Sequence, residues 1–142
     1  PQYILEQSKK AEKKLQQFID EVKKIYNLNN SQICLSGFSQ GCMMSINLGL
    51  ISKESFNCVV GFSGKIINQE DLKNRKISST KILLIHGDQD TVVSSTFLLE
   101  AKDFLIRNNI EVKTIMINNC DHHIPIEASS EALNYIKNNF KI

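Results

Sequence analysis

A Gly-Phe-Ser-Gln-Gly sequence at residues 37–41 is the feature that most constrains how this chain can fold. It follows a short apolar run, residues 33–36, that reads as a buried strand, and it precedes a helix-like stretch over residues 42–51. A GxSxG sequence between a strand and a helix forms a tight turn, and its glycines leave room for the strained serine. The pattern therefore predicts that Ser39 is exposed at the carboxyl edge of a sheet.

The rest of the chain alternates between helical and strand-like patterns. Apolar residues recur at three- and four-residue steps in three segments, which predicts helices over residues 4–26, over residues 96–108 and after Pro125. Apolar runs predict three further buried strands, over residues 56–62, 81–87 and 112–117. Residues 65–80 are polar and weakly patterned, which indicates a loop with a helical turn or two. This order predicts an α/β fold with a mostly parallel sheet and helices on both faces.

Length and composition are those of one ordinary globular domain. The 142 residues carry a net charge of +2, with 42% hydrophobic and 23% charged residues, and the lysines are scattered. These values favour neither a nucleic-acid nor a membrane partner. No apolar run approaches the ~18 residues of a bilayer span, and residues 1–6 do not resemble a signal peptide. The four cysteines form no CxxC pair, which predicts reduced, buried thiols and a cytoplasmic location.

A serine hydroxyl is a weak nucleophile and needs a histidine base, which a carboxylate must orient. The chain has three histidines, His86, His122 and His123. The carboxylates near them in the sequence are Asp88, Asp90 and Asp121. In α/β-hydrolases the chain order is serine, acid, histidine, each on a loop after a strand. Ser39, Asp90 and His122 satisfy this order, and each follows a predicted strand.

Three segments resemble the phospholipase/carboxylesterase family, which includes acyl-protein thioesterases and small bacterial carboxylesterases. Residues 37–41 carry the family's GFSQG sequence intact, and residues 86–93 match its HGxxDxVV acid motif. Residues 121–124 read Asp-His-His-Ile where the family usually has Gly-His-x-Ile. The resemblance implies an α/β-hydrolase fold with Ser39, Asp90 and His122 as the catalytic triad.

The sequence departs from the family pattern at several positions. Asp121 replaces the glycine before the histidine, so His123 is the alternative base by adjacency. Cys42 replaces a second glycine after GFSQG, which narrows the space at the start of the helix. The segment around Ser63 resembles the family's Ser-Gly pair after the next strand, and it lacks GxSxG spacing. We therefore assign Ser63 no catalytic role.

The remaining polar candidates have simpler interpretations. His86 precedes a glycine at a strand end and is expected to be structural, and Asp88 is expected to shape the turn. A metal site would need more ligands, at a more definite spacing, than Cys120, His122 and His123 provide. We therefore predict that the protein binds no metal and no cofactor. Neither Cys42 nor Cys120 lies on a nucleophile elbow, which argues against a thiol nucleophile.

The resemblance covers the carboxyl-terminal two-thirds of the family domain. The family's early strands, and its Leu-His-Gly-x-Gly loop that supplies a second oxyanion donor, have no match in these 142 residues. We expect residues 1–142 to form a single α/β-hydrolase domain that lacks its first strands, so that one sheet edge is bare. Three alternatives remain open: a longer protein, a homo-oligomer that covers the edge with a second copy, or an impaired remnant.

The sequence predicts a serine hydrolase that cleaves carboxylic esters or acyl thioesters through an acyl-enzyme. Ser39 would attack the carbonyl, His122 would carry the proton, Asp90 would orient His122, and the Gln40 N–H would bind the oxyanion. The expected partner is a small acyl ester or thioester, and short aryl esters are expected substrates by resemblance. The alternative is a catalytically impaired remnant that acts as a self-associating module.

Overall fold

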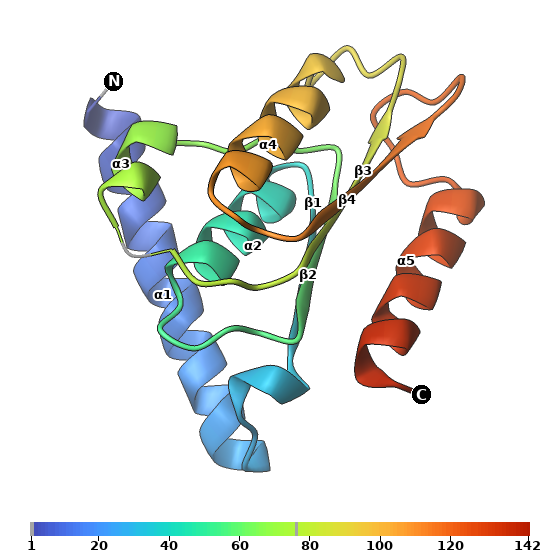
Figure 1. Cartoon of the computed structure of the whole chain (residues 1–142). Helices are drawn as coiled ribbons and strands as arrows, with labels where there is room; N and C mark the ends of the chain where they lie inside the picture. The colour runs from blue at the N-terminus through green and yellow to red at the C-terminus, as the bar shows by residue number, and fades with distance from the viewer. Residues whose placement is uncertain (1, 76) are drawn as a thin grey trace.

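Helices and strands alternate along the chain, as the sequence predicts (Figure 1). The computed structural model describes residues 2–75 and 77–142. The helices are α1 (Gln2–Tyr26), α2 (Gln40–Ile51), α3 (Gln69–Lys73), α4 (Thr96–Arg107) and α5 (Ile126–Phe140), with a short 3-10 helix at Asn30–Gln32. The strands are β1 (Cys34–Phe38), β2 (Cys58–Phe62), β3 (Ile82–Gly87) and β4 (Val112–Ile117). The described part of the polar segment, residues 65–75 and 77–80, holds only the short α3, as its weak pattern indicates.

The four strands form one parallel sheet in the order β1-β2-β3-β4. Every residue of β2 and β3 is buried, which explains why these strands read as unbroken apolar runs rather than as alternating patterns. The register places Gly37 opposite Gly61, and Phe62 opposite Ile85, so that the strands end close to one another. The predicted α/β class with a mostly parallel sheet is confirmed.

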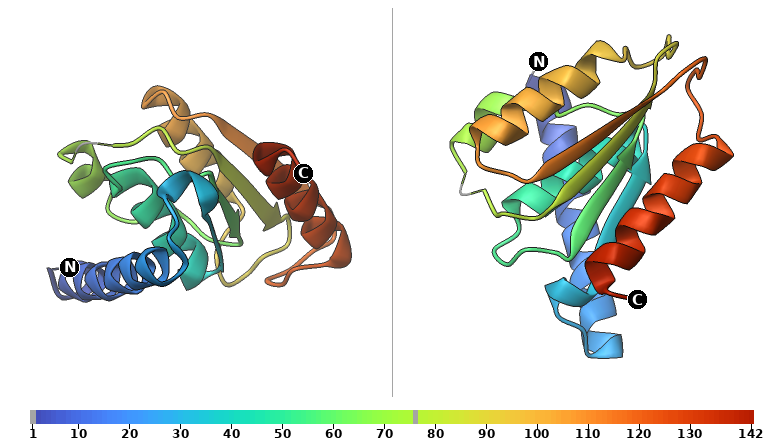
Figure 2. Two further views of the ribbon diagram at one scale, coloured as in Figure 1. Left: turned by 90° about the horizontal axis from the view of Figure 1, so that it is seen from below. Right: turned by 45° about the vertical axis from the view of Figure 1, so that its right-hand side comes forward.

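Helices cover both faces of the sheet (Figures 1 and 2). On one face, α2 and α4 pack against the sheet around a cluster that includes Leu50, Phe104 and Leu84. On the other face, α5 packs through Ala128 and Ala132 against alternate residues of β2 and β3. Helices α2 and α4 lie between parallel strands, and α5 follows the last strand. A connection between parallel strands returns the chain to the edge where the first strand began, so the loops that follow the strands all lie at the same edge of the sheet.

Helix α1 lies outside α2 and is attached by an apolar contact of Ile19 and by polar contacts. Ile19 is its only buried residue among those described. Arg75 donates two hydrogen bonds to the Glu12 carboxylate, at 2.9 and 3.0 Å, and Asn47 of α2 donates a third at 2.7 Å. Burial opposes ionisation of Glu12, and these donors nevertheless hold its pKa below the usual value. Within the described residues, none of the helices combines the length and the apolar character that a bilayer span needs.

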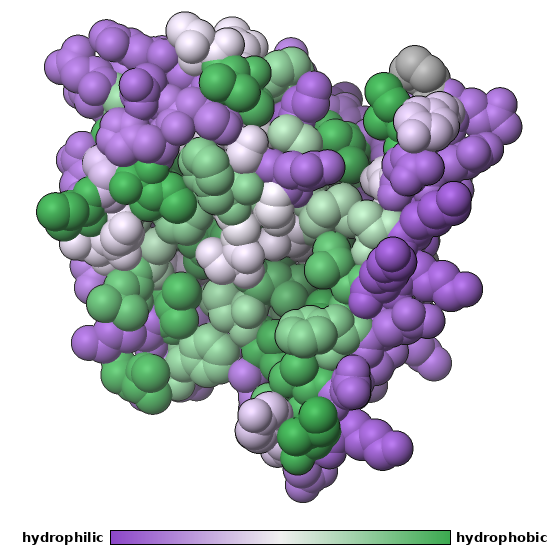
Figure 3. Space-filling view, turned by 180° about the vertical axis from the view of Figure 1, so that it is seen from behind, coloured by the Kyte–Doolittle hydropathy of each residue, from purple (hydrophilic) through white to green (hydrophobic). Residues whose placement is uncertain are grey.

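The outer edge of β1 has no partner strand among the described residues. Hydrophobic side chains remain exposed on α1 and at the end of β1: Leu15, Phe18, Ile25, Tyr26 and Phe38. The view from behind shows a broad hydrophobic area flanked by hydrophilic surface (Figure 3). Among the described residues, the strand that precedes Ser39 therefore has one edge without a partner strand.

Candidate active site

Ser39 occupies the turn between β1 and α2 with a backbone conformation that only a tightly held residue adopts. Its φ is +55° and its ψ is −115°, a strained combination for a residue with a side chain. The Ser39 N–H donates to the Phe62 carbonyl of β2 at 2.8 Å, and its carbonyl accepts from Met43 N–H at 3.1 Å. These two bonds fix the turn from the sheet side and from the helix side, so the strain is imposed by the surrounding backbone.

Two neighbouring glycines leave room for this turn. A Cβ at Gly37 would lie 2.2 Å from the carbonyl carbon of Gly41, where backbone would have to move. A Cβ at Gly64 would lie 3.0 Å from the Ser39 carbonyl and closer still to the Cys42 side chain. A Cβ at Gly41, in contrast, would meet nothing within 4 Å. Of the two glycines in the GxSxG sequence, Gly37 is therefore required sterically, and Gly41 is not.

Gly37→Ala is expected to destabilise the fold strongly, whereas Gly41→Ala is expected to be tolerated. The first change forces backbone apart at the elbow, at a cost of about 3 kcal/mol or more for an overpacked, non-yielding site. The second adds a methyl group in open space within the first turn of a helix, and should stabilise by about 0.5 kcal/mol. Urea unfolding monitored by circular dichroism measures both effects. Equal midpoints for the two variants would contradict the steric account of Gly37.

His122 lies on the loop after β4 and joins Ser39 to Asp90. Its Nε2 is 3.1 Å from Ser39 Oγ, and its Nδ1 is 2.7 Å from Asp90 Oδ2. An ionised carboxylate only accepts hydrogen bonds, so Nδ1 carries the proton and Nε2 is free to accept from the serine hydroxyl. The Phe38 ring packs on the imidazole, with ring centroids 4.7 Å apart. His122 is therefore held by contacts on its face and at both ring nitrogens.

Asp90 is fixed more firmly than any other candidate at this edge. It is 7% exposed, and Oδ1 accepts from the N–H groups of Val92 and Val93 at 2.9 and 2.8 Å. Burial opposes its ionisation, yet the hydrogen bonds from His122 and from these two N–H groups hold the pKa of Asp90 below its usual value. The carboxylate is thus charged near neutral pH and presents its second oxygen to His122.

The loops after β3 and β4 touch at Gly87, which keeps Asp90 and His122 in register. A Cβ at Gly87 would lie 2.3 Å from the Cys120 carbonyl oxygen and 2.6 Å from that of Asp121. Asp88 N–H donates to the Ile117 carbonyl at 2.9 Å, and Asp88 Oδ1 accepts from Cys120 N–H at 3.4 Å. Asp88 thus ties the two loops together, in keeping with the turn-shaping role expected for it.

His86 makes a contact that sequence reasoning did not find. It is 2% exposed, its Nε2 donates to the Val93 carbonyl at 2.8 Å, and the same nitrogen is 3.4 Å from Asp90 Oδ2. Because a carbonyl only accepts, the proton must reside on Nε2. The only sequence signal was the four-residue spacing between His86 and Asp90, which by itself does not imply that the intervening turn folds back.

The other candidates lie apart from this chain of hydrogen bonds. His123 Nδ1 contacts Asp121 and lies near Cys120, so the alternative base faces away from Ser39. Ser63 directly follows β2 with the same φ of +55°, is 2% exposed, and makes no side-chain hydrogen bond in the part of the chain that is described. Gln40 is the first residue of α2, so its N–H has no acceptor in a preceding turn and is available to a ligand beside Ser39.

No group of three or more His, Cys, Asp or Glu side chains within residues 2–75 and 77–142 is arranged to hold a metal ion. Cys120, His123 and Asp121 are neighbours, but the two side-chain contacts among them join only pairs. A serine hydroxyl hydrogen-bonded to an imidazole is suited chemically to nucleophilic attack by the alcohol with the imidazole as base.

A family model and several known proteins are similar to this chain. A family model described as Phospholipase/Carboxylesterase matches residues 3–140. Acyl-protein thioesterase 1 of Yarrowia lipolytica is 28% identical over 120 residues, which cover 78% of this chain and 51% of that protein. Acyl-protein thioesterase 1 of Aspergillus fumigatus is 35% identical over 72 residues, 47% of this chain and 30% of that protein. The chain thus spans about half or less of the curated relatives it matches.

Solved structures show the same fold. The crystal structure of esterase PE8 matches with a TM-score of 0.90 at 29% identity, covering 92% of this chain and 61% of that chain. The Bacillus cereus carboxylesterase matches with a TM-score of 0.76 at 19% identity, covering 90% of this chain and 59% of that chain. The described residues therefore correspond to the larger part, and not the whole, of these folds.

Proposed function

Because the chain belongs to the phospholipase/carboxylesterase family, we propose that it is a serine hydrolase that cleaves carboxylic esters or acyl thioesters. The proposed catalytic unit is one domain over residues 1–142, with Ser39 as nucleophile, His122 as base and acid, and Asp90 as orienting carboxylate. One observation carries this proposal: two hydrogen bonds, of 3.1 and 2.7 Å, connect Ser39 to His122 and His122 to Asp90 across three separate loops.

The mechanism follows from the direction of these hydrogen bonds. Ser39 Oγ attacks the acyl carbonyl while His122 Nε2 takes its proton, and the Nδ1–H of His122 stays on Asp90, which stabilises the imidazolium. The imidazolium then gives the proton to the leaving alcohol or thiol, and an acyl-Ser39 ester remains. Water then attacks the acyl-Ser39 ester, with His122 again as base. The ester bond breaks, Ser39 takes back the proton from His122, and the carboxylic acid is released.

The developing oxyanion lies beside Ser39 and needs hydrogen-bond donors. The Gln40 N–H at the start of α2 supplies one, aided by the positive end of the helix dipole. Each such donor is worth roughly 10²–10³ in turnover. The family resemblance implies a second donor from the Leu-His-Gly-x-Gly loop, which these residues do not contain.

Labelling with a fluorophosphonate probe tests the proposal in the purified natural protein. Ser39 Oγ should displace fluoride from the probe, and the adduct should map to the tryptic peptide of residues 25–53. Ser39→Ala should remove the label, whereas Ser36→Ala, in the same peptide, should keep it. Absence of a Ser39-dependent adduct in correctly folded protein would overturn the proposed activity.

The open edge of β1 favours a second candidate function, an impaired hydrolase that self-associates through this edge. The edge strand lacks a partner among the described residues, and Phe18 nearby is 63% exposed. Such unpaired edges template pairing with another chain. This candidate predicts an oligomer in light scattering and no fluorophosphonate adduct. A monodisperse monomer that takes the label would exclude it.

A further inference from the structure

Cys34 and Cys58 face each other at the amino ends of β1 and β2. They are direct partners in the parallel register, so their Cα atoms are separated by one strand spacing, about 4.8 Å. Disulfides form between Cα atoms roughly 4.4–6.8 Å apart. Each cysteine is the first residue of its strand, where the backbone has most freedom to adjust. The spacing therefore suits a cross-strand bond.

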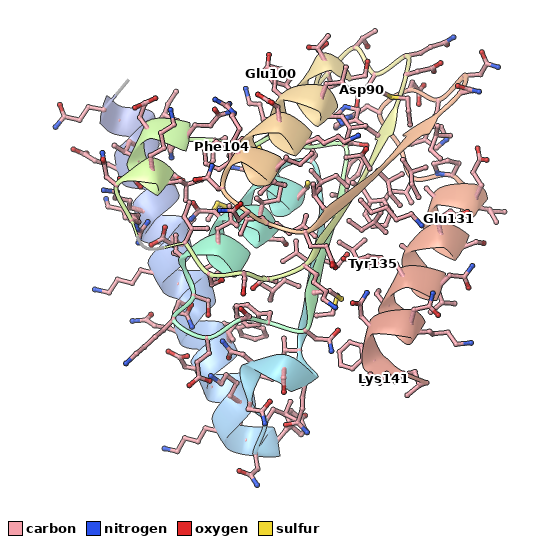
Figure 4. The ribbon with its side chains drawn as sticks, in the orientation of Figure 1. Asp90, Glu100, Phe104, Glu131, Tyr135 and Lys141 are labelled. Carbon is pink, nitrogen blue, oxygen red and sulfur yellow. The ribbon has the colours of Figure 1, made fainter. Side chains whose placement is uncertain are left out.

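The two side chains also point to the same face of the sheet. Cys34 packs with the cluster beneath α5, and Cys58 shares that face because it alternates with Val60 and Phe62, which belong to the same cluster. Tyr135 of α5 packs there as well and lies on the side of the helix that faces the sheet (Figure 4). The other cysteine of this region, Cys42, belongs to the cluster on the opposite face.

All four cysteines are free thiols, and they differ in reactivity. A hydrogen bond from Cys58 holds the pKa of Cys34 below its usual value, and the same interaction, together with burial, raises the pKa of Cys58. Cys34 is partly exposed, whereas Cys58 is buried. Burial raises the pKa of Cys42 to about 12, and burial together with nearby carboxylates raises that of Cys120. The expectation that all thiols are buried is thus wrong for Cys34, which lies on the edge strand and has the most thiolate character.

We propose that Cys34 and Cys58 form a redox-responsive dithiol that closes to a disulfide when a peroxide oxidises Cys34. The Cys34 thiolate attacks one peroxide oxygen, the O–O bond breaks, and the departing hydroxide takes a proton to become water. Cys58 Sγ then attacks the Cys34 sulfenic sulfur, the S–O bond breaks, and the departing hydroxide takes the Cys58 proton and leaves as a second water. Two thiols and one peroxide thus give one disulfide and two waters, and a dithiol reductant reverses the change.

The disulfide would connect the strand that carries Ser39 to its only partner strand among the described residues. Exposed disulfides are the labile, regulatory ones, and Cys34 is partly exposed. The site lies at the opposite end of β1 from Ser39, so its oxidation is distinct from the proposed acyl chemistry and does not depend on it.

Peroxide treatment of the purified, reduced protein tests this inference. After oxidation, denaturation and alkylation, the protein should be lighter by two hydrogen atoms and should carry two alkyl groups instead of four. A non-reducing tryptic digest should contain residues 25–53 linked to residues 54–65, and a dithiol should separate them. Because the first peptide holds both Cys34 and Cys42, variants are needed to assign the bond.

Cys34→Ala should abolish the link and leave Cys58 open to alkylation, whereas the matched change Cys42→Ala should leave the link intact. The measurement on the unsubstituted protein stands even if a variant folds poorly. Three results would each overturn the inference: four alkylated thiols after peroxide, a link that survives Cys34→Ala, or a sulfinic acid at Cys34 with Cys58 still free.

Discussion

Ser39→Ala should lower hydrolysis of a short aryl ester by about 10⁴-fold or more, because the acyl-enzyme can no longer form. His122 and Asp90 would remain hydrogen-bonded at 2.7 Å, with an imidazole that has no alcohol to deprotonate. What remains is binding and the donor at Gln40, which support only a weak background reaction. Initial rates with a p-nitrophenyl ester measure the loss, and circular dichroism verifies the fold.

Ser63→Ala is the matched control for this experiment. Ser63 directly follows β2, as Ser39 directly follows β1, and the two residues have the same φ of +55°. It differs in that no histidine lies within hydrogen-bond distance among the described contacts. The expected change in rate is less than about tenfold. A loss at Ser63 equal to that at Ser39 would show that the elbow conformation, and not the imidazole, defines the nucleophile.

The sequence predicted every strand of this sheet because buried parallel strands are apolar along their whole length. The run predicted over residues 112–117 has the observed bounds, and the others differ by one or two residues at their ends. β1 begins and ends later than predicted, at Cys34 and Phe38, because the elbow glycine extends the strand into the GxSxG sequence. The residues at which a strand begins and ends depend on its hydrogen bonds to neighbouring strands. The sequence of a single segment does not specify these hydrogen bonds.

The meeting of Ser39, Asp90 and His122 followed from topology. Each residue comes after a parallel strand, and the carboxyl ends of such strands share one edge of the sheet. The contacts of Phe38 and His86 could not be obtained in this way. They depend on how a turn folds back and on which side chain fills the space above a ring, and both are set by packing rather than by spacing.

The amphipathic pattern of α1 predicted a helix correctly and said nothing about what covers its apolar residues. Only Ile19 is buried, while Phe18, Ile25 and Tyr26 are more than 60% exposed. A periodic pattern indicates that a helix has an apolar side, but it does not indicate what packs against that side.

Asp90→Asn should lower kcat/KM by about 10⁴-fold while the protein stays folded, because it reverses the tautomer of His122. The asparagine oxygen can still accept from Val92 and Val93 N–H, which turns its NH₂ group toward His122 Nδ1. An NH₂ group donates, so Nδ1 must become the acceptor and the imidazole proton moves to Nε2. Nε2–H then faces Ser39 Oγ and cannot take its proton.

Asp88→Asn provides the comparison that separates orientation from simple loss of charge. Asp88 is exposed, two residues earlier on the same loop, and accepts only from Cys120 N–H, which an amide oxygen can replace. Its kcat/KM should stay within about threefold of the unsubstituted protein, since an exposed charge contributes little. Thermal melting of both variants guards against unfolding. If Asp90→Asn retained more than a tenth of the activity, or if Asp88→Asn lost as much, the carboxylate that orients His122 would have to be sought elsewhere.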